Sequence, residues 1–281
     1  MKIIHSVEEM KSSTHATRRG RRSIGFVPTM GALHEGHRAL IRRARRENDQ
    51  VVVSIFVNPA QFGPREDFTQ YPRALSKDLA LLKQEKCDVV FIPSASQIYP
   101  PEFSTWVDVP ACSASLCGKF RPGHFRGVAT VVAALFQIVQ PTRAYFGLKD
   151  YQQCRVIDRM VKDLQIPVRV VACPTVREPD GLACSSRNRR LSKRDREEAV
   201  KLYQALYLGR ELIEQKIMLD SGRLETRLKQ VLSQIPHCRI DYIAVVDPVT
   251  LAPMRKIRRP AVLAAALWIG KTRLIDNVVI S

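Results

Sequence analysis

The sequence predicts an α/β protein with a parallel sheet, followed by a smaller α+β domain. In the first part of the chain, short apolar runs of strand composition alternate with longer segments of helical periodicity, which is the pattern of a parallel sheet with crossover helices. After residues 168–173 the pattern changes to two charged helical segments followed by short strands. We therefore expect one domain at residues 1–175 and a second at residues 176–281.

The elements of both domains follow from this periodicity. In the first domain we expect strands near 24–28, 51–57, 88–92 and 143–146, and helices near 36–48, 75–86, 127–139 and 150–164. In the second we expect helices over 192–215 and 221–234, and strands near 239–246, 261–269 and 273–280. The turn at 178–181, Glu-Pro-Asp-Gly, predicts that the next segment is a loop able to close over a cleft.

The most informative segment is 27–37, Val-Pro-Thr-Met-Gly-Ala-Leu-His-Glu-Gly-His. It joins an apolar strand to a helix through a Gly-containing turn. Such a turn points the first N–H groups of the helix at one place, where the helix dipole also favours an anion. His34 and His37 are three residues apart, so they would share a face of the first helical turn and donate hydrogen bonds to phosphate oxygens. The segment predicts a nucleotide phosphate site.

The two histidines allow two other interpretations. A zinc protease helix needs His-Glu-x-x-His, and the spacing here is one residue short. The seven cysteines lack the spacing of a disulfide framework or a zinc knuckle, so we expect reduced thiols. Partly buried histidines without a special role remain an alternative, which the Gly-containing turn makes less favourable.

Length and composition restrict the kinds of protein that this chain can be. The 281 residues, 45% of them hydrophobic, are enough for two modest domains. No secretory signal and no run of about 18 apolar residues is present, so we expect a cytoplasmic protein without membrane insertion.

The net charge of +18 is unusually basic for an enzyme of small metabolites. Arginine clusters at 18–22, 38–46, 187–196 and 255–259 are typical of a nucleic-acid binder. However, only 7% of residues are aromatic, and no stacking platform accompanies the arginines. The arginines after His37 recur at helical spacing on the face opposite Leu40, Ile41 and Ala44, as on an ordinary solvated helix face. Nucleic-acid binding is therefore an alternative that the sequence does not favour.

Residues 28–37 resemble the signature of the pantothenate synthetase family, the pantoate–beta-alanine ligases. Further segments resemble blocks of this family in the same order along the chain: 54–62, 121–128, 146–153, 180–188 and the terminal 272–277. Several blocks in one order are far more specific than any single motif. The resemblance implies a Rossmann-like, nucleotidyltransferase-type catalytic domain, a smaller C-terminal lid domain and a homodimer.

The resemblance also implies a reaction. The carboxylate of (R)-pantoate would attack the α-phosphorus of ATP to give pantoyl adenylate and pyrophosphate, and the amine of β-alanine would then displace AMP to give pantothenate. ATP enters as a substrate with Mg²⁺, the metal ligands are unknown, and no other cofactor is expected.

The site residues are implied by the same resemblance. His37, His34, Lys149, Ser185, Ser186 and Arg187 would be catalytic. The ATP site would comprise Met30, Gly31, Ala32, Leu33, His34, Glu35, Gly36, His37, Gly147, Leu148, Lys149, Asp150, Val176, Cys184, Ser185, Ser186 and Arg187. Gln61, Gln153 and Asn58 would bind pantoate or β-alanine. Each has an ordinary structural alternative: Ser185, Ser186 and Asp150 as helix caps, Gln61 as a turn residue and Lys149 as a surface cation.

The chain departs from the family pattern at a few positions. Leu148 stands where the family commonly has glutamate, Ala60 and Cys184 replace a methionine and a larger apolar residue, and Asp78 is the main carboxylate of a segment that is usually more acidic. Two other classes stay open. One is another nucleotidyltransferase, such as a relative of class I aminoacyl-tRNA synthetases, which would not need both Gln61 and Gln153. The other is a non-catalytic nucleic-acid-binding relative, favoured by the charge and by Leu148.

Overall fold

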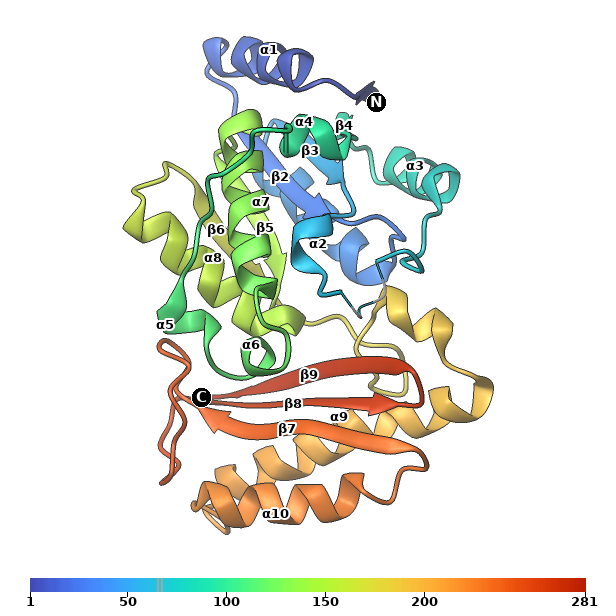
Figure 1. Cartoon of the computed structure of the whole chain (residues 1–281), viewed down its shortest axis with the longest axis vertical. Helices are drawn as coiled ribbons and strands as arrows, with labels where there is room; N and C mark the ends of the chain where they lie inside the picture. Colours follow the sequence, from blue (N-terminus) through green and yellow to red (C-terminus); the bar gives the residue numbers. More distant parts are fainter. Residues whose placement is uncertain (65, 67) are drawn as a thin grey trace. The chain divides into compact units, whose positions relative to one another are not determined.

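The first sheet consists of six parallel strands in the order β1-β4-β3-β2-β5-β6. The structure is a computed structural model that describes residues 1–64, 66 and 68–281. The chain divides into two compact units, of which the first comprises Met1–Ser113, Arg121–Leu148 and Gln153–Pro174 and holds this sheet (Figure 1). Its strands are β1 (Lys2–Ile4), β2 (Ile24–Thr29), β3 (Gln50–Ile55), β4 (Val89–Phe91), β5 (Arg143–Gly147) and β6 (Arg169–Cys173).

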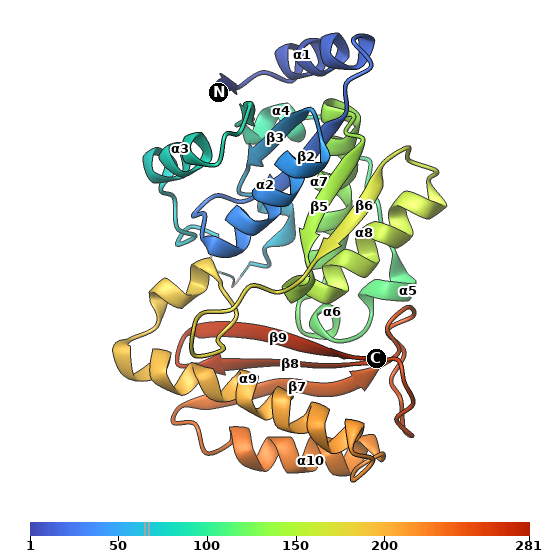
Figure 2. The same cartoon turned by 180° about the vertical axis from the view of Figure 1, so that it is seen from behind.

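Helices cover both faces of this sheet, so its central strands are apolar along their length. Val51, Val52 and Val53 of β3 are all fully buried. Helix α7 lies on the near side in Figure 1, and α2 lies on the near side in Figure 2, where the molecule is seen from behind. The helices are α1 (Val7–Arg19), α2 (Glu35–Glu47), α3 (Leu75–Gln84), α4 (Ala95–Ile98), α5 (Pro110–Ser113), α7 (His124–Val139) and α8 (Tyr151–Asp163), with 3-10 turns η1 (Pro59–Gln61) and η2 (Leu148–Asp150).

The second unit comprises Ala114–Phe120, Lys149–Gln152 and Thr175–Ser281. Its antiparallel sheet is formed by β7 (Cys238–Val246), β8 (Ala261–Ile269) and β9 (Thr272–Ile280). The helical elements are α6 (Cys117–Phe120), η3 (Ser186–Arg190), α9 (Lys193–Glu214) and α10 (Ser221–Leu232). Helix α9 packs against β8 and β9, and α10 packs against β7.

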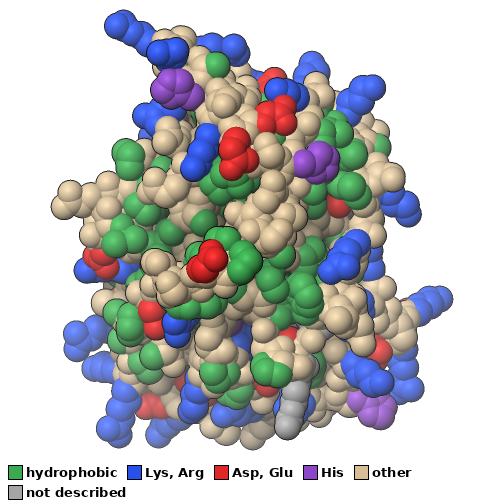
Figure 3. All heavy atoms as spheres, turned by 45° about the horizontal axis from the view of Figure 1, so that its top comes forward, with side chains coloured by type: hydrophobic (Ala, Val, Ile, Leu, Met, Phe, Trp, Pro, Cys, Tyr) green, Lys and Arg blue, Asp and Glu red, His purple; other side chains and the backbone are tan. Residues whose placement is uncertain are grey.

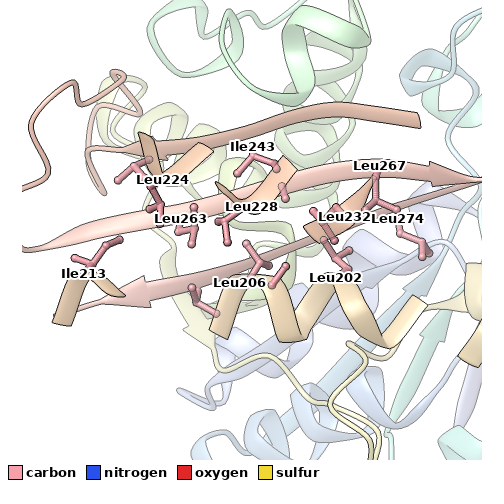
Figure 4. Close-up of a cluster of buried hydrophobic side chains, with 14 of the residues drawn as sticks. Leu202, Leu206, Ile213, Leu224, Leu228, Leu232, Ile243, Leu263, Leu267 and Leu274 are labelled. Carbon is pink, nitrogen blue, oxygen red and sulfur yellow. The ribbon is translucent and has the colours of Figure 1, made fainter. Parts of the chain in front are cut away.

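Leucines from α9 and α10 interdigitate with those of the small sheet to form the core of the second unit (Figure 4). Leu202, Leu206 and Leu228 are at most 1% exposed. At Gly209 of α9, an added Cβ would lie 2.5 Å from Leu263 Cδ2, so the absence of a side chain there permits close packing of helix on strand.

The α/β architecture and the smaller C-terminal sheet expected from the sequence are confirmed. The structure adds β1, α1, β6 and the short helices α4 to α6, which the periodicity did not reveal. Helix α1 was missed because it buries only Met10 and Thr14, too few positions for an apolar stripe. Helix α7 begins at His124, three residues earlier than expected.

The arginines of α2 are engaged in ion pairs. Arg38 and Arg42 both contact Glu85, at 2.6 and 2.8 Å, and Arg45 contacts Asp88 at 2.5 Å. The opposite face of the helix buries Leu40, Ile41 and Ala44, as expected for a solvated helix face. In Figure 3 the Lys and Arg side chains are scattered over the visible face and do not gather in one patch.

Candidate active site

The sheet extends from β2 in opposite directions, through β3 and β4 on one side and through β5 and β6 on the other. The carboxyl end of β2 is therefore a topological switch point, where open α/β sheets bind ligands. The segment that leaves β2 at this point is the turn of residues 30–33, which leads directly into α2. Gly31 and Ala32 both adopt positive φ, +80° and +50°, as a tight turn requires.

A buried carboxylate holds this turn. The backbone N–H groups of Ala32 and Leu33 each donate to one oxygen of Asp78, both at 2.8 Å, and Asp78 is 3% exposed. A Cβ added at Gly31 would lie 3.1 Å from the same carboxylate, so glycine permits the close approach. Asp78 thus acts within the protein as a tether of the turn, a role that the sequence did not reveal.

His34 and His37 face each other on the first turn of α2, with ring centroids 4.1 Å apart. His34 is the N-cap, and its Nδ1 accepts from the Gly36 N–H at 3.2 Å. The Nδ1 atom of His37 accepts from the His34 N–H at 3.3 Å. Since Nδ1 is an acceptor in both rings, a neutral ring carries its proton on Nε2. Both rings therefore present Nε2–H donors beside the positive end of the helix, an arrangement suited to phosphate oxygens.

Gln61 lies next to this turn, in the 3-10 turn η1 that follows β3. Its Nε2 donates toward Met30 Sδ at 3.0 Å, and its Oε1 accepts from Asn58 Nδ2 at 3.1 Å. The structure therefore brings Gln61 next to Met30, in the turn that leads to His34 and His37, at the carboxyl edge of the sheet. Gln61 is 9% exposed.

Arg121 and His124, from the 121–128 block, form a cluster with Glu66 that supports the backbone of Gln61. His124 Nδ1 lies 2.8 Å from the Gln61 carbonyl oxygen and must donate to it, because a carbonyl only accepts. Arg121 donates to Glu66 Oε2 at 2.5 Å and lies 3.0 Å from His124 Nε2. Burial alone would raise the pKa of Glu66, but the hydrogen bond and charge of Arg121 outweigh it, and the pKa lies below its ordinary value. The resemblance to the family includes this block, but the sequence alone did not indicate its role.

Strand β5 contributes Gly147 and the start of η2 to the same edge, beside β2. The thiol of Cys154 donates to the Gly147 carbonyl at 3.3 Å, which holds the strand end against α8. Gln153 lies in the first turn of α8 and is half-buried. The neighbouring Gln152 is buried, and its amide bridges the backbone of residues 115 and 117 in the second unit. This contact distinguishes the structural glutamine from the candidate substrate ligand.

The remaining candidates belong to the second unit. Lys149 Nζ lies 3.7 Å from Asp150 Oδ1, and the Lys149 carbonyl accepts from Asn277 Nδ2 at 2.9 Å. Both residues precede α8. Asn277, from the terminal block of the sequence, therefore anchors the backbone of Lys149 to β9.

Val176 and Cys184 pair in a small hairpin, in which Cys184 N–H donates to the Val176 carbonyl at 3.0 Å. Ser185 follows it and caps η3, its Oγ accepting from the Arg187 N–H at 3.3 Å. This is the ordinary structural role that the sequence left open for Ser185, and it does not prevent the hydroxyl from donating to a ligand.

Asn188 secures the loop that carries Ser186 and Arg187. Its Nδ2 donates to Glu178 Oε1 at 2.8 Å and to the Ala183 carbonyl at 3.1 Å. Glu178 in turn pairs with Arg196 of α9 at 2.5 Å. The loop is thus tied to both the hairpin and the first turns of a long helix.

Within the described part of the chain, no three or more His, Cys, Asp or Glu side chains are grouped so that they could hold a metal ion. None of the helices that the structure describes has the length and apolar character needed to cross a membrane.

The chain is similar over its whole length to known proteins. The family model of pantoate-beta-alanine ligase matches residues 2–279. The pantothenate synthetase of Thermotoga neapolitana is 52% identical over 100% of both chains. The crystal structure of pantothenate synthetase from Thermus thermophilus has a TM-score of 0.93 and 48% identity, over 99% of each chain. That of pantoate-beta-alanine ligase from Francisella tularensis, complexed with beta-gamma ATP and beta-alanine, has a TM-score of 0.82 and 38% identity, over 99% of this chain and 97% of the other.

Proposed function

This chain belongs to the pantoate-beta-alanine ligase family, and from that membership we propose that it condenses (R)-pantoate with β-alanine in two steps that pass through pantoyl adenylate. The observation that carries the proposal is the pair of Nε2–H donors of His34 and His37 at the N-terminus of α2, beside the Gln61 amide. A phosphate site next to an amide suits a reaction that joins ATP to a carboxylic acid.

In the first step, a carboxylate oxygen of pantoate attacks the α-phosphorus of ATP and pyrophosphate leaves. Negative charge spreads over the phosphate oxygens as the bond to the leaving group lengthens. His34, His37 and the first N–H groups of α2 would stabilise that charge, with His37 as the principal donor. Gln61 and Gln153 would hold pantoate, because an amide binds a carboxylate without adding charge that would weaken the nucleophile.

We assign the second unit's candidates to the nucleotide. Lys149 would hold phosphate charge, Asp150 would accept from ribose hydroxyls, and Val176 would border the adenine. Ser185, Ser186 and Arg187 would donate to the pyrophosphate leaving group from the mobile lid that residues 176–281 are expected to form.

In the second step, the amine of β-alanine attacks the acyl carbon of pantoyl adenylate, and AMP leaves with the bonding electron pair of the acyl–oxygen bond. Exclusion of water before this attack matters, since the adenylate is an activated acyl group that water also hydrolyses.

Mg²⁺ is expected to enter as part of the Mg–ATP substrate, bound to phosphate oxygens and water. Asp78, which contacts the turn of residues 30–33, uses both of its oxygens for backbone N–H groups. We therefore assign Asp78 to the turn and do not name it as a direct ligand of the metal.

The test is ATP–pyrophosphate exchange with Mg²⁺, measured with and without pantoate. We expect exchange only with pantoate, and formation of pantothenate and AMP once β-alanine is added. A folded protein that shows no pantoate-dependent exchange would refute the proposal and favour the basic-binder alternative, which steeply salt-dependent RNA or DNA binding would then test.

We also propose that the protein is a homodimer, and only its resemblance to the family supports this. Light scattering coupled to size-exclusion chromatography would decide it, with a mass near 31.8 kDa expected for a monomer and twice that mass for the dimer.

A further inference from the structure

Asn58 and Tyr99 form a hydrogen-bonded chain behind Gln61, within the first unit. Tyr99 Oη donates to Asn58 Oδ1 at 2.7 Å, and Asn58 Nδ2 donates to Gln61 Oε1 at 3.1 Å. Asn58 is 1% exposed. Neither Tyr99 nor the chain it begins was recognised in the sequence.

Two backbone groups, one that can only accept a hydrogen bond and one that can only donate, fix the orientation of the Asn58 amide. The Gly127 carbonyl, which only accepts, lies 3.1 Å from Nδ2, and the Ala60 N–H, which only donates, lies 3.2 Å from Oδ1. A flipped amide would place oxygen against oxygen and nitrogen against N–H. Asn58 therefore has one orientation, and all four of its hydrogen-bonding positions are used inside the protein.

The fixed Asn58 amide fixes Gln61 in turn. Nδ2 of Asn58 must donate, so Gln61 must present its Oε1 to it. Gln61 Nε2 then faces Met30, the first residue of the turn 30–33. Gln61 consequently offers N–H donors to that side, which suits the acceptor oxygens of a carboxylate and does not suit a cationic amine.

Tyr99 is well placed to maintain this arrangement. Its ring packs edge-on against Phe103, at 4.9 Å between centroids, and is stacked with Trp106 at 6.4 Å. Burial raises the pKa of the Tyr99 hydroxyl by more than the Asn58 hydrogen bond lowers it, so the group keeps its proton and remains a donor.

We infer that Tyr99 is a positioning residue for the acid substrate, because its hydroxyl acts through Asn58 to keep the Gln61 N–H donors directed at the substrate carboxylate. This inference rests on the proposed function, which supplies pantoate as the acid. It assigns Asn58 to positioning and leaves the substrate contact to Gln61.

The test is Tyr99→Phe, which removes one oxygen and keeps the ring. Loss of one hydrogen bond to a buried amide is expected to raise KM for pantoate about three- to tenfold, with KM for ATP unchanged. The matched control is Tyr145→Phe. Tyr145 Oη also contacts a buried asparagine, Asn48, at 2.6 Å, but it lies outside the proposed site. We expect that variant to lose stability without any change in KM for pantoate.

A double-mutant cycle separates positioning from general destabilisation. In a Gln61→Ala background, Tyr99→Phe should raise KM for pantoate no further. A second variant, Asn58→Asp, keeps the oxygen that Tyr99 addresses but loses the donor to Gln61, and the same rise is expected from it. An unchanged KM in Tyr99→Phe, or its full effect in the Gln61→Ala background, would overturn the inference. Absence of pantoate-dependent exchange in the wild type would instead refute the proposed function.

Discussion

His37 Nδ1 accepts a hydrogen bond from the backbone N–H of His34 at 3.3 Å, so one active-site candidate caps the helix turn that carries the other. The arrangement is a capping box in which two histidines stand where serine and glutamate are usual. The cap uses the Nδ1 atoms of both rings. Helix capping therefore uses one nitrogen of each ring, and the phosphate contact that we propose uses the other.

Replacing either histidine should remove function while leaving the fold intact. We expect His34→Ala and His37→Ala each to lower the rate of pantoate-dependent exchange by about 100-fold or more, since each removes a donor to the developing phosphate charge. Circular dichroism should show native structure, because a lost cap costs only about 1 kcal/mol. Turnover like the wild type in both variants would refute the assigned site.

A finer substitution tests which ring nitrogen is used. The amide nitrogen of glutamine reaches the place of Nε2, whereas that of asparagine reaches the place of Nδ1. His37→Gln should therefore retain more exchange activity than His37→Asn. The reverse order would mean that the phosphate contact is made by Nδ1.

Asp78 should affect ATP more than pantoate. In Asp78→Asn, one carboxylate oxygen becomes an NH₂ group that opposes a backbone N–H of the turn. Leaving a buried donor without its acceptor costs about 1–3 kcal/mol, and we expect a lower melting temperature together with a raised KM for ATP. Asp49→Asn is the matched control, since Asp49 accepts from the Ser23 N–H at 2.7 Å at the opposite end of β2. A KM for ATP that shifts equally in the two variants would contradict a specific role for Asp78.

The two glutamines should define pantoate binding. For Gln61→Ala and Gln153→Ala we expect KM for pantoate to rise about tenfold or more, because each loses a hydrogen bond to a charged group, while KM for ATP stays near that of the wild type. Steady-state kinetics with each substrate varied in turn would measure this. If only the dependence on ATP changed, the assignment of both residues would be wrong.

The sequence predicted the central strands, the principal helices and the C-terminal sheet because these elements have strong apolar periodicity. It also identified the histidine turn, since a Gly-containing turn between strand and helix is a local signal. It did not predict Asp78 as a tether, or Tyr99 and His124 as supports of η1, because each acts on a residue more than 40 positions away. Partners at such distances are set by packing, on which local pattern carries no information.

Gly127 illustrates the same limit. By propensity alone, Gly127→Ala within α7 should stabilise the protein by up to about 1 kcal/mol. In the structure, however, an added Cβ would lie 2.1 Å from the Ala60 carbonyl oxygen and 2.7 Å from the Gln61 backbone nitrogen. We expect a loss of about 1–3 kcal/mol and a raised KM for pantoate as η1 shifts. Gly222→Ala in α10, where the nearest atom is 3.4 Å away, should be neutral or slightly stabilising. Equal melting temperatures for the two variants would contradict this packing argument.

The contribution of Glu66 to the stability of the protein should depend on pH. Burial opposes its charge, but Arg121 prevails and the pKa lies below the ordinary 4.5. A carboxyl group with a lowered folded pKa contributes stability that is full above its unfolded pKa and is lost as the pH falls through the folded pKa. The difference in unfolding free energy between wild type and Glu66→Gln should therefore be largest near neutral pH and should shrink below pH 4.5.

Glu225 provides a control of opposite sign for this measurement, because burial raises its pKa against the smaller effect of Lys229. Its charge opposes folding at neutral pH, so Glu225→Gln should be more stable than the wild type there, and the difference should vanish as the pH falls. Denaturant titrations across this range would measure both variants. If the Glu66→Gln difference did not depend on pH, the Arg121 ion pair would not be what stabilises the ionised carboxylate.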